Sequence, residues 1–122
     1  MTYKQVYQAV SSVTVSTSTT DTIPCAYWMF PEDDPNNPAP PPPFIVYYYT
    51  DSNDLLADGI NYQKIRGLTV ELYCDNKDFT LEQAVEDKLT SNGFVYSKAE
   101  DYIESEKLYM TSYESEVIIT NG

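Results

Sequence analysis

The chain has 122 residues, of which 7 are basic and 19 are acidic, giving a formal net charge of −12 at pH 7. This charge repels nucleic-acid phosphates and anionic lipid headgroups, so it argues against sequence-specific nucleic-acid binding and against membrane binding. A hydrophobic share of 42% is sufficient for a packed core, and the length predicts one domain spanning residues 1–122.

The first third of the chain predicts one helix and one strand. A helical stripe predicts an amphipathic helix over residues 3–12, formed by Tyr3, Val6, Tyr7 and Val10. The Ser/Thr-rich residues 11–22 fit either a loop or a weak edge strand. The apolar run Ile23–Phe30 predicts the first strand, and Pro24 near its start is typical of an edge strand.

Residues 31–43 combine acidic side chains with many prolines. Proline lacks an amide hydrogen and restrains the residue before it, so we expect an exposed acidic loop here, with Asp33 and Asp34 near its start. Pro40–Pro43 could bind a polyproline-recognising groove, but no basic residue flanks it. A stiff loop is the favoured interpretation.

The middle of the chain predicts two strands separated by a loop. Phe44–Tyr49 is a continuous apolar run, which predicts a central strand covered on both faces. Residues 50–59 are polar and acidic and predict a loop. A longer strand is expected from Asn61 to Tyr73, with Leu68, Val70 and Leu72 on its buried face.

The last third predicts a helix and two strands. Thr80 and Gln83 form a capping-box pattern at the start of the helix, and Asn92–Gly93 is a stop signal at its end. Residues 94–104 and 107–119 alternate in polarity and predict a closing antiparallel pair. The predicted fold class is α+β, with a mainly antiparallel sheet of about four to five strands flanked by two helices.

Chemical signals are few. The chain has no histidine, which removes the commonest general base and zinc ligand. The acidic pairs Glu104/Glu106 and Glu114/Glu116 are placed by strand spacing on a solvated face. Asp51–Gly59 lacks the residue order of a calcium loop. We therefore expect no catalytic residue, no metal and no cofactor: the protein is predicted not to be an enzyme.

The cysteines and the first residues of the chain carry no signal of a reactive site or of export. Cys25 and Cys74 are far apart in sequence and predict buried, reduced thiols, with a disulfide as the alternative. The first residues do not follow the basic-then-apolar pattern of a signal peptide, so we expect a product that stays where it is made.

Candidate partner-contact residues lie in the two acidic loops. Leu55 and Leu56 are paired leucines in a polar segment, and such a pair needs either the core or a partner to cover it. Both alternatives remain open from the sequence. The predicted partner-contact residues are Asp33, Asp34, Asn53, Asp54, Leu55 and Leu56.

Four segments of the chain carry a resemblance to a known family: Ile23–Asp33, Pro42–Tyr47, Leu72–Asp78 and Tyr102–Tyr109. Together they resemble a family of small morphogenesis proteins of long-tailed phages and prophages of Gram-positive bacteria, the tail terminator or tail-to-head joining proteins. The resemblance implies a homo-oligomer, a hexameric ring on the last disc of the tail tube, with a monomer in solution also open. Its implied partners are the tail tube protein and the head completion or connector protein.

The same resemblance implies a location at the head–tail junction of the virion, after synthesis in the host bacterial cytoplasm. DNA would pass through the acidic ring without adhering. Two alternatives remain: another head completion or minor tail protein, and, in a different class, an acidic monomeric binding module or inhibitor of a host protein.

Overall fold

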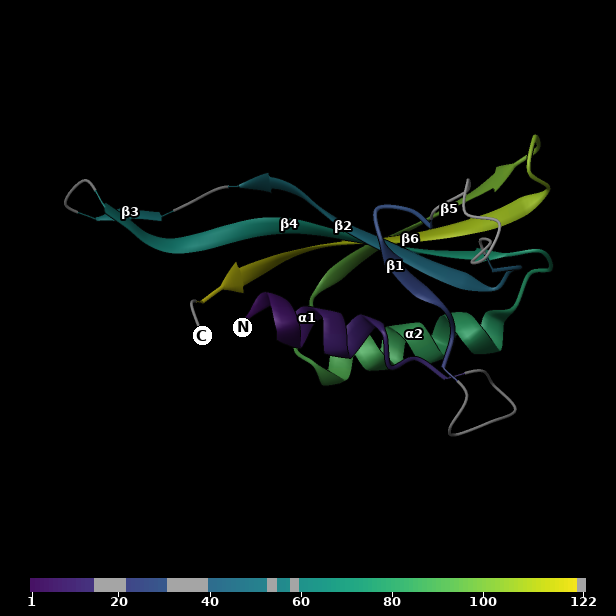
Figure 1. The fold of residues 1–122 in the computed structure, drawn as a ribbon, viewed down its shortest axis with the longest axis horizontal. Coiled ribbons are helices and arrows are strands. Elements are labelled where there is room, and N and C mark those ends of the chain that lie inside the picture. The colour runs from purple at the N-terminus through teal and green to yellow at the C-terminus, as the bar shows by residue number, and fades with distance from the viewer. Residues whose placement is uncertain (15–21, 31–39, 53–54, 58–59, 121–122) are drawn as a thin grey trace.

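The structure, a computed structural model, describes residues 1–14, 22–30, 40–52, 55–57 and 60–120. Two helices lie on one side of a single twisted sheet (Figure 1). In these ranges no helix covers the opposite side of the sheet. The fold is α+β, as predicted. No helix in the described ranges is long and apolar enough to cross a lipid bilayer.

Five strands form the main sheet in the order β1-β2-β4-β6-β5. β1 runs parallel to β2, and the other neighbouring pairs are antiparallel. A further strand, β3, pairs with the first residues of β4 where the sheet extends beyond the helices (Figure 1). The strands are β1 Cys25–Tyr27, β2 Phe44–Ser52, β3 Leu55–Ala57, β4 Ile60–Cys74, β5 Tyr96–Ile103 and β6 Leu108–Ile119.

Helix α1 spans Tyr3–Val10, two residues fewer than predicted at its end. Its start is fixed by a capping box: the Gln5 amide donates to the Thr2 hydroxyl at 3.1 Å, and the Gln5 side chain accepts from the Thr2 amide at 2.8 Å. The buried side of the helix consists of Val6, Ala9 and Val10. Val6 and Val10 of the predicted stripe are thus buried, whereas its other two members, Tyr3 and Tyr7, are 43% and 49% exposed.

Helix α2 spans Phe79–Ser91, and its start differs from the prediction. The capping box expected at Thr80 and Gln83 is wrong, because Asp78 is the N-cap and its carboxylate accepts from the Leu81 amide at 2.9 Å. An aspartate at this position satisfies a free amide of the first turn, and its negative charge interacts favourably with the helix dipole. The end at Asn92 and Gly93 is confirmed, since Gly93 takes a φ of 84° that suits glycine.

The core lies between the sheet and the two helices. Leu68, Val70 and Leu72 of β4 are each no more than 2% exposed, which confirms their predicted inward direction. Opposite them α2 contributes Leu81, Val85 and Leu89, and within the sheet Tyr113 of β6 lies beside Val70. Burying each of these aliphatic side chains contributes about 1.5–3 kcal/mol relative to leaving it in water.

The strands confirm most predictions and correct three. β2 lies inside the sheet as predicted, and Ile45 and Val46, which point to opposite faces, are both buried. The first strand is shorter than residues 23–30, because Trp28 leaves the extended conformation with a φ of 71°. The predicted loop over residues 50–59 is wrong in part, since β2 continues to Ser52 and β3 follows it.

The third correction concerns one of the acidic pairs. Strands β5 and β6 form the predicted antiparallel pair. Glu104 and Glu106 were expected on the wet face of a strand, but they lie in the turn between β5 and β6, where they are exposed. Glu114 and Glu116 do lie on a strand, β6, and are exposed as expected.

Candidate functional site

One face of the sheet points away from both helices, and we call it the helix-free face (Figure 1). Directly paired residues of antiparallel strands project to the same face, so the register identifies its members. The three central rows, read from β2 to β5, are Phe44, Tyr73, Met110 and Asp101; Val46, Glu71, Ser112 and Ala99; and Tyr48, Thr69, Glu114 and Ser97.

Stacked aromatic rings occupy the β1–β2 side of this face. The Trp28 indole stacks on the Tyr48 ring, with centroids 4.7 Å apart and planes 7° apart. Phe44 stacks on Tyr73 at 5.0 Å and meets the edge of Phe30 at 5.4 Å. Trp28 remains 54% exposed and its neighbour Met29 69% exposed. Large, rigid, half-exposed rings of this kind are typical of protein contact surfaces.

The backbone at Trp28 directs its indole onto this face. A bulky residue at φ 71° is uncommon and costs about 1 kcal/mol. The conformation is held by the Trp28 amide, which donates to the Tyr47 carbonyl at 2.9 Å. β1 therefore ends in a turn that places the chain's single tryptophan over Tyr48.

Glu71 joins the two aromatic stacks. Its two carboxylate oxygens accept separate phenol hydrogens, from Tyr48 at 3.1 Å and from Tyr73 at 2.9 Å. Burial raises the pKa of both tyrosines, and the nearby Glu71 carboxylate raises it further, because ionising either phenol would place two negative charges together. The rings are therefore fixed in orientation by one shared carboxylate.

The helix-free face carries acids and, at its described strand positions, no lysine or arginine. Glu114 and Glu116 of β6 are exposed next to a shallow open hollow over β4, β5 and β6. The strand lysines and arginine that belong to the opposite face by register are Lys64, Arg66 and Lys98. This separation gives the helix-free face a negative potential beside its aromatic side.

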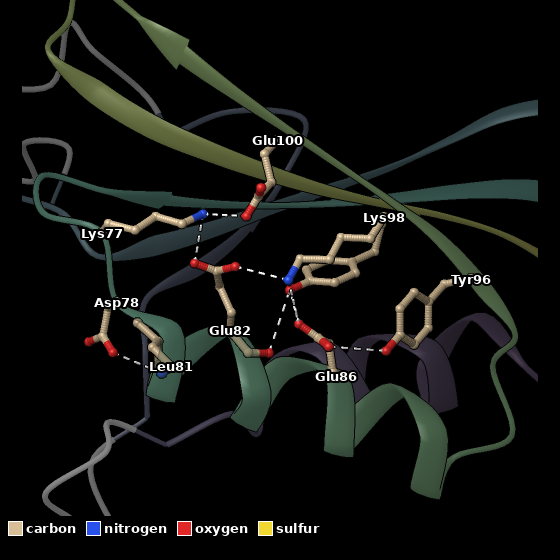
Figure 2. Close-up of polar contacts among 9 residues, drawn as sticks. Lys77, Asp78, Leu81, Glu82, Glu86, Tyr96, Lys98 and Glu100 are labelled. Atoms are coloured by element: carbon tan, nitrogen blue, oxygen red, sulfur yellow. Dashed lines mark hydrogen bonds and ion pairs between the residues drawn. The ribbon is translucent and has the colours of Figure 1, made fainter.

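A second polar cluster lies on the helix side, between α2 and β5 (Figure 2). Glu82 of α2 is buried and contacts two lysines: Lys77 Nζ lies 2.9 Å from its Oε2, and Lys98 Nζ lies 3.0 Å from its Oε1. Lys98 also contacts Glu86 at 3.1 Å, and Lys77 contacts Glu100 on β5. The cluster links α2, the segment before it and the edge strand.

The charges in this cluster compensate one another. Burial opposes the charged form of both lysines, but hydrogen bonds and charge from the glutamates outweigh it, so the pKa values of Lys77 and Lys98 are raised. The Tyr113 hydroxyl donates to Glu86 at 2.9 Å, and burial raises its pKa. Every carboxylate here has a cationic or phenolic partner, which is typical of a structural network rather than of a reactive site.

Of the predicted partner-contact residues, only Leu55 and Leu56 lie in the described part of the chain. Asp33, Asp34, Asn53 and Asp54 lie outside the described residues. Leu55 and Leu56 are described by their backbone, which forms β3 and pairs antiparallel with β4. Among described residues, no group of three or more cysteine, aspartate or glutamate side chains could hold a metal ion.

The sequence did not predict that Trp28 and Met29 are exposed, nor that Trp28 stacks on Tyr48. They were assigned to strands from apolar runs, and an apolar run does not tell which side chains a layer covers. One signal was available: Trp28 and Met29 precede the proline-rich segment, where a strand must end.

The two thiols are on different strands and are free. Cys74 of β4 is buried and Cys25 of β1 is partly buried, and β2 lies between these strands. Burial raises the pKa of each thiol to about 11, so the reactive thiolate is scarce at neutral pH.

A scan against protein-family models matches none. A search of curated protein sequences also finds no significant match.

Proposed function

We propose that this protein is a structural component of phage assembly that caps a tail tube, stops its growth and provides the surface to which the head joins. The observation that carries the proposal is the helix-free face, where exposed stacked aromatics lie beside carboxylates. The resemblance of the four sequence segments to tail terminator proteins supplies the specific role.

The aromatic side of the face suits contact with an ordered protein surface. Trp28, Met29 and Tyr48 offer apolar area, and Tyr48 has its phenol already held by Glu71. Rings that are fixed before binding lose little conformational entropy on contact, so they contribute more net affinity than mobile side chains. In this proposal the face meets the last disc of the tube or a neighbouring subunit.

The acidic residues suit a ring through which DNA passes. Glu114 and Glu116 are exposed and have no basic neighbour on their face. Carboxylates of this kind repel DNA phosphates, so a channel near them would not retain the DNA. The segments holding Asp33, Asp34, Asn53, Asp54, Leu55 and Leu56 are proposed to reach toward the tube or the head connector.

The test is to mix the purified protein with tail tubes from a phage that lacks its terminator and to image the tube ends by negative-stain electron microscopy. Caps confined to one end, together with restored joining of heads, are the expected result. Bare ends on tubes that a genuine terminator still caps would refute the proposal and favour the role of a head completion or minor tail protein.

A second candidate function is an acidic module that binds a basic site on a host protein. The absence of basic side chains at the described positions of the helix-free face favours it. Its expected mark is binding to a basic protein that weakens steeply with salt, with no affinity for tail tubes. Binding to tubes that persists at high salt would exclude this candidate.

A further inference from the structure

The outer edge of β5 is long and regular. β5 has eight residues, six of them exposed, and pairs with β6 without a register shift. In the described part of the chain no other strand pairs with its outer side. Sheet edges are usually protected by shortness, proline or a bulge, and β5 has none of these.

Two of the three charged side chains of β5 do not protect this edge in the usual way, and the third, Asp101, belongs to the helix-free face. Lys98 and Glu100 project to the helix side, where they form ion pairs with Glu82, Glu86 and Lys77 and remain 33% and 51% exposed (Figure 2). The same contacts hold the strand against α2. The result is a regular, anchored strand whose outer amides and carbonyls are free to accept another strand within the described part of the chain.

We infer that β5 pairs antiparallel with β5 of a second copy of this chain, about a two-fold axis at Ala99. In this register Lys98 of each copy lies opposite Glu100 of the other, and Tyr96 lies opposite Tyr102. Both pairs also belong to one face of the sheet, the helix side, since β5 pairs these four residues with the helix-side residues of β6. Opposite charges and paired aromatics each stabilise a cross-strand contact.

The neighbouring registers are unfavourable. A shift of two residues one way sets Lys98 opposite Lys98, and a shift the other way sets Glu100 opposite Glu100. A shift by one residue would bring helix-side residues opposite residues of the helix-free face, which antiparallel pairing forbids. The sequence of β5 therefore selects a single two-fold register with small Ala99 side chains at the axis.

This inference goes beyond the proposed function and does not rest on it. A two-fold contact closes on itself, whereas a ring is built from head-to-tail contacts. The β5 pair is accordingly a form of the free protein, and its failure would leave the capping proposal untouched.

The first test is a cross-link at the axis. Ala99→Cys should form a disulfide-linked dimer under mild oxidation, measured by non-reducing electrophoresis, while the buried native thiols react slowly. Ser97→Cys is the matched control: in the inferred register its two copies are four residues apart along the strands, roughly 14 Å, too far for a disulfide. Efficient linking of Ser97→Cys, or none of Ala99→Cys, would overturn the register.

The second test uses the oligomeric state of the unmodified chain, which needs no variant to fold. Light scattering during size-exclusion chromatography should show a dimer that dissociates on dilution. Glu100→Lys, which sets a lysine opposite Lys98 twice, should weaken the dimer about tenfold. Glu114→Lys makes the same charge change on β6 and should leave dimerisation unchanged. A wild-type protein that remains monomeric up to high concentration would overturn the inference.

Discussion

The two edges of the sheet are held by different forces. β1 is a three-residue strand next to Pro24, and it ends at the turn of Trp28. Aromatic contacts hold it: Tyr27 lies 5.2 Å from Tyr47, and Trp28 stacks on Tyr48. β5 has eight residues and is held by ion pairs to α2. The β1 edge is closed by the turn at Trp28 and by ring packing. The β5 edge stays available for pairing with another strand and is held by ion pairs.

This comparison predicts that the β5 edge depends on one buried carboxylate. Glu82→Ala would leave Lys77 and Lys98 without their shared partner, and these side chains are only 24% and 33% exposed. We expect a loss of about 2–3 kcal/mol in the free energy of unfolding, below the ~3–5 kcal/mol typical of fully buried pairs. Urea denaturation measures the loss, and amide exchange should accelerate in β5 more than in β1.

The control for this variant is Glu104→Ala, which removes an exposed carboxylate in the turn after β5. It should change stability by less than about 0.5 kcal/mol. Equal effects of the two substitutions would show that Glu82 does not anchor the edge.

The β1 edge should instead be sensitive to alkaline pH. Burial, followed by the nearby Cys25, Tyr7 and Tyr27, raises the pKa of Tyr47 to about 12, above the ordinary value near 10. A raised pKa in the folded state contributes stability below pH ~10 that is lost as the pH rises toward 12. The urea midpoint of unfolding should fall between pH 9 and 11.5, and Tyr47→Phe should make this fall with pH less steep. If the midpoint of this variant falls with pH as steeply as in wild type, the loss of stability belongs to other tyrosines.

The smallest expected effect is at Trp28, where two substitutions distinguish the contribution of ring packing from that of backbone strain. Trp28→Ala loses the stack on Tyr48, worth about 0.5–1.5 kcal/mol, and keeps a non-glycine residue at φ 71°. Trp28→Gly loses the same stack but relieves the strain, so it should be more stable than Trp28→Ala by about 1 kcal/mol. Denaturation followed by circular dichroism measures both. A glycine variant less stable than the alanine variant would contradict the strain argument.

The secondary structure was largely readable from the sequence because its signals are local. The stripe over Tyr3–Val10, the alternation of Leu68, Val70 and Leu72, and the Asn92–Gly93 stop all act within one element. The start of α2 is the exception: aspartate and threonine both suit an N-cap, and the structure uses Asp78 rather than the predicted Thr80.

The candidate surface was not readable, since it depends on contacts between distant elements. Glu71 accepts from Tyr48, which is 23 residues away. In the polar cluster on the helix side of the sheet, Lys98 of β5 likewise reaches Glu82 of α2. Neither pair follows a sequence spacing. The β3 strand was missed for a similar reason: its partner, the start of β4, becomes a sheet edge only because β4 extends past β2.

The most direct test compares how well variants at the end of β1 and at the start of α2 cap tail tubes. The double variant Trp28→Ala/Met29→Ala removes exposed apolar area from the turn at the end of β1, whereas Phe79→Ala removes an exposed ring from the start of α2. We predict that the double variant loses end-specific capping at concentrations where wild type saturates the ends, and that Phe79→Ala caps like wild type. Capping that survives the double variant and is lost with Phe79→Ala would contradict the assignment of the contact surface.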